Sequence, residues 1–158
     1  MIVRGLFWAA VVAAADQASK AAVLAHFGAR GCVNESQTFT RFFDLVLTCN
    51  RGMSFGLFND SGGPSALVFS LFAAAIVVLL LIWLSRTKSR LLAIAIGFVI
   101  GGAIGNVVDR LRFGAVVDFL SFHAGAWYWP AFNIADSAIS IGVALMLIDG
   151  LLLHGRED

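Results

Sequence analysis

The sequence predicts an all-α membrane protein, a four-transmembrane-helix bundle that forms a single integral membrane domain over residues 1–158. Two observations lead to this prediction. Of the 158 residues, 59% are hydrophobic and only 13% are charged, whereas an ordinary soluble domain carries roughly 25% charged residues. In addition, four stretches are mostly apolar and approach the length of ~20 residues that a spanning helix needs. A domain of this size and composition has too little polar surface to cover itself in water.

The four predicted spans cover residues of about 2–24, 66–84, 91–108 and 132–153. The second and third are free of charge, the fourth contains Asp136 and Asp149, and the first contains Arg4, Asp16 and Lys20. Because Arg4 precedes a short apolar stretch, a cleavable signal peptide is the alternative for the first segment. The i, i+4 spacing of Asp16 and Lys20, with apolar residues resuming after them, favours a helix that is retained.

A short basic loop sets the predicted orientation in the membrane. Arg86, Lys88 and Arg90 lie between the second and third spans, and the positive-inside rule places such a loop in the cytoplasm. Both termini are then cytoplasmic, and residues of about 26–64 and 110–131 are extracytoplasmic. The aromatic residues 127–129 precede the fourth span, as residues of a membrane–water interface do.

Composition also excludes several classes of function. The net charge is +1 and no basic block occurs, so we expect no nucleic-acid partner. Two cysteines and three widely spaced histidines provide no cluster with metal-ligand spacing, so we expect no metal. The chain has no glycine-rich phosphate-binding loop, so we expect no nucleotide cofactor.

Ionisable residues in or near membrane segments are costly, so each is a candidate for a specific role. We expect Asp16 and Lys20 to form a buried ion pair that orients the first helix. Asp109 and Arg110 are neighbours in sequence and point apart on a helix, so each needs a partner elsewhere. Asp109 is expected to be structural, Arg110 is a candidate for binding a carbonyl-rich ligand, and Asp149 is expected to be solvated at the inner side.

Small and polar residues form stripes on the third and fourth spans. Gly97, Gly101 and Gly105 recur every four residues, which predicts close packing against another helix. Asn106 and Arg110 are also four residues apart, and so share one face at the outer end of the third span. The polar stripe of the fourth span should turn toward the bundle; it consists of Asn133, Asp136, Ser137 and Ser140.

Asp118 and Asp136 differ from the other acidic residues because neither has a basic residue three or four positions away. A carboxyl group in a poorly solvated site takes a raised pKa, and two that meet share one proton. Such a pair is the machinery of an aspartic protease, in which one group takes a proton from water and the other polarises the scissile carbonyl. Proton-coupled transport by the same carboxylates is the main alternative at this point.

Five motifs, occurring in order along nearly the whole chain, resemble those of the lipoprotein signal peptidase (signal peptidase II) family. The family's D-Q-x-[ST]-K motif is matched by residues 16–20 and N-x-G-x-[AS]-F by residues 50–55. The motif G-G-x-x-G-N-x-x-D-R is matched by residues 101–110, V-V-D-F by residues 116–119, and F-N-x-A-D by residues 132–136.

The resemblance implies an aspartic endopeptidase of the bacterial cytoplasmic (inner) membrane, with its active site at the outer leaflet. Its substrates would be diacylglyceryl-modified prolipoproteins, from which it removes the signal peptide by cutting before the lipidated cysteine. Membrane lipid is the other expected partner, the protein would be a monomer, and no cofactor is needed. The resemblance also implies a small extracytoplasmic β-cradle over residues of about 30–60 and a short periplasmic helix near residues 111–125. An inactive relative that binds lipidated signal peptides is a third alternative.

The resemblance assigns expected roles by motif position. The catalytic pair would be Asp118 and Asp136, without an assignment of acid and base. The positions that would bind substrate or hold the catalytic pair are Asn50, Gly52, Asn106, Arg110 and Asn133, and those with a structural role are Asp16, Lys20 and Asp109.

Two features of the outer segment stand apart from these roles. Arg51 and Met53 are bulkier than the residues usual beside that glycine, which bears on substrate entry. Cys32 and Cys49 are expected to be unpaired, although both lie outside the membrane, where a disulfide is possible.

Overall fold

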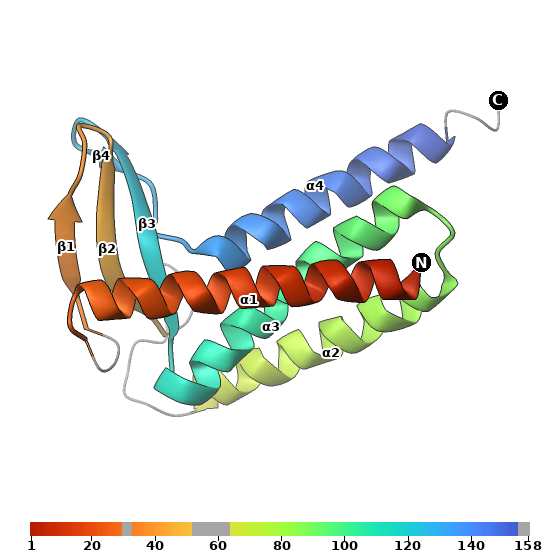
Figure 1. The fold of residues 1–158 in the computed structure, drawn as a ribbon, viewed down its shortest axis with the longest axis horizontal. Coiled ribbons are helices and arrows are strands. Elements are labelled where there is room, and N and C mark those ends of the chain that lie inside the picture. Colours follow the sequence, from red (N-terminus) through yellow and green to blue (C-terminus); the bar gives the residue numbers. More distant parts are fainter. Residues whose placement is uncertain (30–32, 52–63, 155–158) are drawn as a thin grey trace.

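The computed structural model describes residues 1–29, 33–51 and 64–154. It consists of four long helices that run side by side and a small antiparallel sheet at one end of them (Figure 1). The helices are α1 (Ile2–His26), α2 (Pro64–Arg86), α3 (Arg90–Phe113) and α4 (Ile134–His154). The strands are β1 (Glu35–Thr38), β2 (Phe43–Asn50), β3 (Val116–Ala124) and β4 (Trp127–Tyr128).

Three helices among the described residues are long and apolar enough to cross a membrane. They are α2 from Ala66 onward, the whole of α3, and α4 as far as Leu151. The 25-residue helix α1 is not among them, so the first predicted span stays a prediction. The helix α3 extends beyond the third predicted span, through Asp109 and Arg110 to Phe113.

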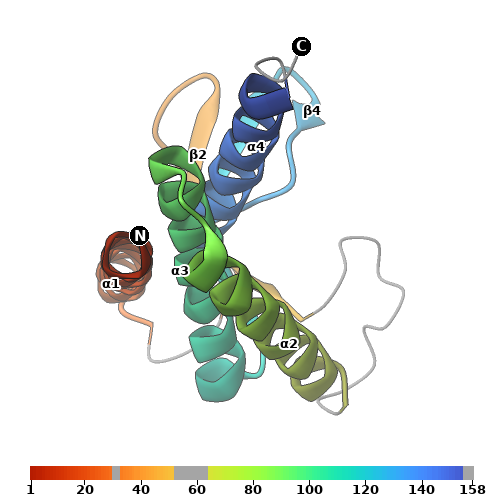
Figure 2. The same ribbon diagram turned by 90° about the vertical axis from the view of Figure 1, so that its right-hand side faces the viewer.

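The helix α3 occupies the centre of the helical part, with the other three arranged around it (Figure 2). Its glycines allow this close packing, as predicted from their spacing. A Cβ atom at Gly101 would lie 2.5 Å from the carbonyl oxygen of Ala9 in α1, and one at Gly102 would lie 2.5 Å from that of Ala135 in α4. Any larger residue would therefore push a neighbouring backbone away.

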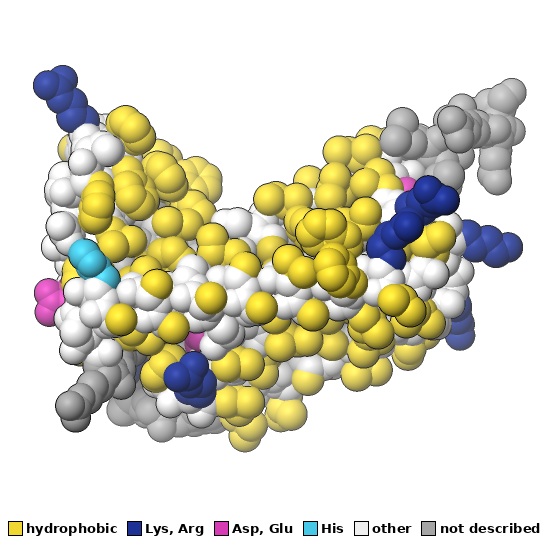
Figure 3. Space-filling model, in the orientation of Figure 1, with side chains coloured by type: hydrophobic (Ala, Val, Ile, Leu, Met, Phe, Trp, Pro, Cys, Tyr) yellow, Lys and Arg dark blue, Asp and Glu magenta, His cyan; other side chains and the backbone are white. Residues whose placement is uncertain are grey.

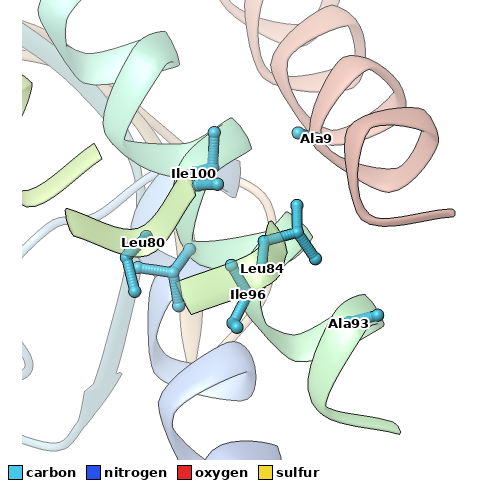
Figure 4. Packing of buried hydrophobic residues seen from close by; sticks show 7 residues of the cluster. Ala9, Leu80, Leu84, Ala93, Ile96 and Ile100 are labelled. Atoms are coloured by element: carbon cyan, nitrogen blue, oxygen red, sulfur yellow. The ribbon is translucent and has the colours of Figure 1, made fainter. Parts of the chain in front are cut away.

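A cluster of aliphatic side chains fills the space between α1, α2 and α3 in the part of the bundle remote from the sheet. Leu84, Ala93 and Ile96 are completely buried there, and Leu80 and Ala9 pack against them (Figure 4). Hydrophobic side chains also cover the outside of the helices, while Lys and Arg side chains gather at the right-hand end, opposite the sheet (Figure 3). Helices that are apolar both inside and outside are typical of a membrane protein.

The predicted β-cradle is present, but one of its four strands, β3, comes from a segment expected to be helical. The strand order is β1-β2-β3-β4, and every pair is antiparallel. The expectation of a short helix near residues 111–125 is wrong, because β3 runs from Val116 to Ala124. Gly114 ends α3 in a left-handed conformation with φ of 69°, and the β-branched and aromatic residues that follow favour a strand.

A second apolar cluster joins the sheet to the C-terminal end of α1. Val23 of α1 packs there with Leu47 of β2 and with Val117 and Phe119 of β3. Since Val117 and Phe119 flank Asp118 in the strand, their burial fixes the register of β3 and directs Asp118 to the opposite face of the sheet.

Two further expectations are wrong. Asp149 is not solvated: it is only 6% exposed, and its Oδ1 accepts a hydrogen bond from Ser89 Oγ, the side chain that also caps the first turn of α3. Cys49 is not unpaired: it is disulfide-bonded, and no cysteine of the described residues is free. Cys32, which the sequence expectation also covers, lies outside the described residues.

Candidate active site

Asp118 lies in β3 with only 2% of its surface exposed, and amide groups from two other elements hold its carboxylate. Asn133 Nδ2 donates to Asp118 Oδ1 at 2.8 Å, and Asn50 Nδ2 donates to Asp118 Oδ2 at 3.1 Å. The sheet register explains the second contact, because Asn50 at the end of β2 pairs with Val116, two residues before Asp118 on the same face. Both carboxylate oxygens are therefore satisfied.

Asp136 lies in the first turn of α4, and Asn133 immediately precedes this helix. The backbone N–H of Asp136 donates to Asn133 Oδ1 at 2.9 Å, and that of Asn133 donates back to Asp136 Oδ2 at 3.3 Å. This reciprocal arrangement is equivalent to a capping box. Asn106 Nδ2 of α3 donates to Asp136 Oδ1 at 2.8 Å. Asn133 thus contacts both carboxylates and links Asp118 to Asp136.

The environment of Asp118 changes its acidity. Burial, and after it the negative charge of Asp136, raise the pKa of Asp118 from 3.8 to about 7, although the hydrogen bonds from Asn50 and Asn133 act in the opposite direction. The two carboxylates are therefore close enough to interact electrostatically. At neutral pH, Asp118 holds its proton in a large fraction of molecules.

Behind this carboxylate pair lies a buried cluster of three charged side chains, the Lys20 cluster (Asp16, Lys20 and Asp109). The expected ion pair is present, with Lys20 Nζ 2.8 Å from Asp16 Oδ2, and the same ammonium lies 2.6 Å from Asp109 Oδ2. All three residues are at most 2% exposed. Asp109 thus has the partner elsewhere that its sequence position requires.

Arg110 is not in hydrogen-bond contact with either carboxylate of the pair. Its Nη1 donates to the backbone oxygen of Asn106 at 3.4 Å, and its guanidinium lies over the ring of Phe69, 5.6 Å from the centroid.

The exposed Arg51 follows β2. Gly52 and Met53, also singled out in the sequence, lie outside the described residues.

Sequence reasoning missed two groups, one in contact with the Lys20 cluster and one on the same strand as Asp118. Gln17 Nε2 donates to Asp109 Oδ1 at 2.9 Å and so extends the Lys20 cluster; its position next to Asp16 was the available signal. The ring of Phe122 packs between those of Phe43 and Phe132, with centroids 5.2 Å and 6.0 Å away, and is stacked on the latter. The alternation of β3 gives the signal here, because Phe122 lies four residues after Asp118 and so shares its face.

The molecular surface is hollowed between the sheet and α4 (Figure 3). The carboxylate pair lies where these two elements meet, and Asp136 is partly exposed while Asp118 is buried. Fold and site together define a helical membrane protein with two interacting carboxylates at the junction of its bundle and its sheet.

This chain belongs to the signal peptidase (SPase) II family, whose model matches residues 8–152. It is 42% identical over 147 residues to the lipoprotein signal peptidase of Methylorubrum extorquens (strain PA1), covering 93% of this chain and 85% of that protein. It is 46% identical over 154 residues to the lipoprotein signal peptidase of Nitrobacter hamburgensis, covering 94% of this chain and 92% of that protein. The family identifies a membrane-bound hydrolase of the protease class.

Two solved structures, each described as that of a bacterial membrane enzyme and determined by the in meso method, have the same fold. One has a TM-score of 0.79 at 25% sequence identity, covering all of this chain and 93% of that one. The other has a TM-score of 0.78 at 25% sequence identity, covering 96% of this chain and 94% of that one.

Proposed function

We propose that this protein is an aspartic endopeptidase that removes signal peptides from diacylglyceryl-modified bacterial prolipoproteins by cutting before the lipidated cysteine. Membership in the signal peptidase II family supports the reaction. The observation that carries the aspartic mechanism is the link through Asn133, which contacts the carboxylates of both Asp118 and Asp136. Two interacting carboxylates can share one proton and act as an acid and a base.

In the proposed mechanism the pair begins with one shared proton, and the raised pKa of Asp118 favours that residue as its holder. Asp136 takes a proton from water as the water oxygen attacks the scissile carbonyl carbon, and Asp118 gives its proton to the carbonyl oxygen. In the second step the proton on Asp136 passes to the leaving nitrogen of the cysteine. Asp118 recovers a proton from the tetrahedral intermediate as the C–N bond breaks, which restores the starting state.

The position of the site suits a substrate anchored by lipid. We propose that α1 is the fourth membrane span, that both termini are cytoplasmic, and that the carboxylate pair lies at the outer leaflet of the bacterial cytoplasmic membrane. The basic residues between α2 and α3 support this orientation. A diacylglyceryl chain then stays in the bilayer while the adjoining peptide enters the hollow between the sheet and α4.

The proposed substrate contacts follow from the same arrangement. Asn50, Asn106 and Asn133 already hold the carboxylate pair, and Arg110 would donate to substrate carbonyls from the outer end of α3. Gly52 remains a proposed contact on its motif position alone. We further propose that the enzyme acts as a monomer.

The test is cleavage of a purified diacylglyceryl-modified prolipoprotein by the parent protein and by Asp118→Asn and Asp136→Asn. Asp149→Asn is the matched control, because it removes a third carboxylate, also buried, from the far end of α4. We expect the parent and the control to release the signal peptide and both pair variants, although folded, to lose several orders of magnitude in rate. An inactive parent, or a pair variant that cleaves at the parent rate, would refute the proposal in favour of a binding or proton-transport role.

A further inference from the structure

The backbone next to each residue of the carboxylate pair is held from behind by a second carboxylate. The N–H of Ala135, which precedes Asp136, donates to Asp16 Oδ1 at 2.9 Å. The N–H of Val117, which precedes Asp118, donates to Asp109 Oδ2 at 3.1 Å. Each member of the pair therefore has its own buried anchor, one on α1 and the other on α3.

Lys20 connects these two anchors. Its ammonium contacts Asp16 at 2.8 Å and Asp109 at 2.6 Å, and it also donates to Asn106 Oδ1 at 3.3 Å. Asn106 in turn uses its Nδ2 to hold Asp136. Lys20 thus connects to Asp136 through Asp16 and Asn106, and to Asp118 through Asp109, without a hydrogen bond to either carboxylate of the pair.

We infer that Lys20 is a positioning residue that sets the separation of Asp118 and Asp136, an inference that rests on the proposed function. Asp136 lies in α4 and Asp118 in β3. Along the chain, these two elements are joined only by the short segment of residues 125–133. A buried ammonium between two carboxylates resists displacement, because the attraction changes steeply with distance where water is excluded. Such pairs add little net stability compared with apolar residues, which favours a geometric role.

Removing Lys20 should slow the chemical step and leave substrate binding almost unchanged. We expect Lys20→Met to lower kcat about 100-fold, the loss that a misplacement of about 1 Å can cause, and to change KM less than about threefold. Lys20→Arg should recover a large part of kcat, since a guanidinium can also bridge two carboxylates. The Lys20 ammonium contacts Asp16 and Asp109 directly, and its positive charge also acts on Asp118.

A control variant and a replacement variant make this result specific. Ser89→Ala removes the cap at the opposite end of α3, far from the pair, and should lower the melting temperature without lowering kcat. If Lys20→Met does not fold, the double variant Asp16→Asn with Lys20→Met replaces it. This double variant keeps the cluster's net charge of −1, because Asp16, Lys20 and Asp109 sum to the same value as Asp109 alone.

The inference is overturned if the folded Lys20 variant keeps its kcat, if only KM rises, or if Ser89→Ala loses kcat to the same extent. These results are separate from failure of the proposed function, which Asp118→Asn and Asp136→Asn decide in the same assay. If those two variants are inactive and Lys20→Met is fully active, the mechanism stands and the positioning role of Lys20 does not.

Discussion

Replacing Asp118 by Asn should change how the stability of the protein depends on pH. The folded protein binds the Asp118 proton more tightly than the unfolded chain, because burial and the charge of Asp136 raise the pKa of this group to about 7. A group of this kind contributes stability that is fully present below its unfolded pKa of 3.8 and is lost as pH rises through about 7. Asp118→Asn removes the titrating group and therefore this loss.

The size of the effect follows from the two pKa values. The interval between 3.8 and about 7, at about 1.4 kcal/mol for each pH unit, corresponds to on the order of 4 kcal/mol. The Asn side chain also loses one of the two amide contacts of Asp118, at a cost of about 1–2 kcal/mol that does not depend on pH. The variant should therefore be less stable than the parent near pH 4 and more stable near pH 8.

The assay is equilibrium or thermal unfolding of both proteins in the same detergent between pH 4 and pH 8, followed by the fluorescence of the four tryptophans. Ionisable groups other than the carboxylate pair titrate in both proteins, so their contributions largely cancel in the difference in unfolding free energy between parent and variant. The reasoning is refuted if the difference in unfolding free energy stays constant within about 1 kcal/mol over this range. It would then follow that Asp118 is ionised in the folded protein at all these pH values.

Two further predictions follow. Cleavage should decline about tenfold for each pH unit above about 7, as Asp118 loses the proton that it gives to the carbonyl, and a rate that holds constant to pH 9 in a detergent assay would contradict this. Gly102→Ala should reduce cleavage at least tenfold, because its Cβ would lie 2.5 Å from the Ala135 carbonyl and push α4 away beside Asp136. In the control Gly150→Ala, no atom of the described residues outside that helix's own backbone lies within 4 Å of the new Cβ, so the rate should stay unchanged and the melting temperature should stay equal or rise.

Much of the helical architecture is predictable from local patterns. Apolar runs give the position of α2, α3 and α4 within a few residues, and the glycine spacing identifies α3 as the helix that packs most closely. The i, i+4 spacing also identifies the Asp16–Lys20 ion pair. Each of these features depends on residues within a few turns of one another, where helix geometry determines which side chains share a face.

The errors concern features that depend on distant residues. The strand β3 pairs with β2 and β4, so its partners lie elsewhere in the chain, although Gly114 and the following Val and Phe residues already indicate a helix end and a strand. Asp149 is buried because α4 lies beside the first turn of α3, where Ser89 is located. A position near a predicted helix end does not reveal such a neighbour.

The rotation of α3 explains how Asn106 and Asp109, polar residues three positions apart, come to serve different parts of the site. Gly102 contacts α4 and Gly105 contacts Asp16 in α1, and a residue four positions later lies on the same face of a helix. Asn106 therefore faces α4, where it holds Asp136, and Asp109 faces α1, where it meets Lys20. The helix period relates the polar residues to the glycines, but only the contacts with α1 and α4 determine which helix each glycine faces. The same close contacts that pack the bundle thus orient the side chains that hold the carboxylate pair.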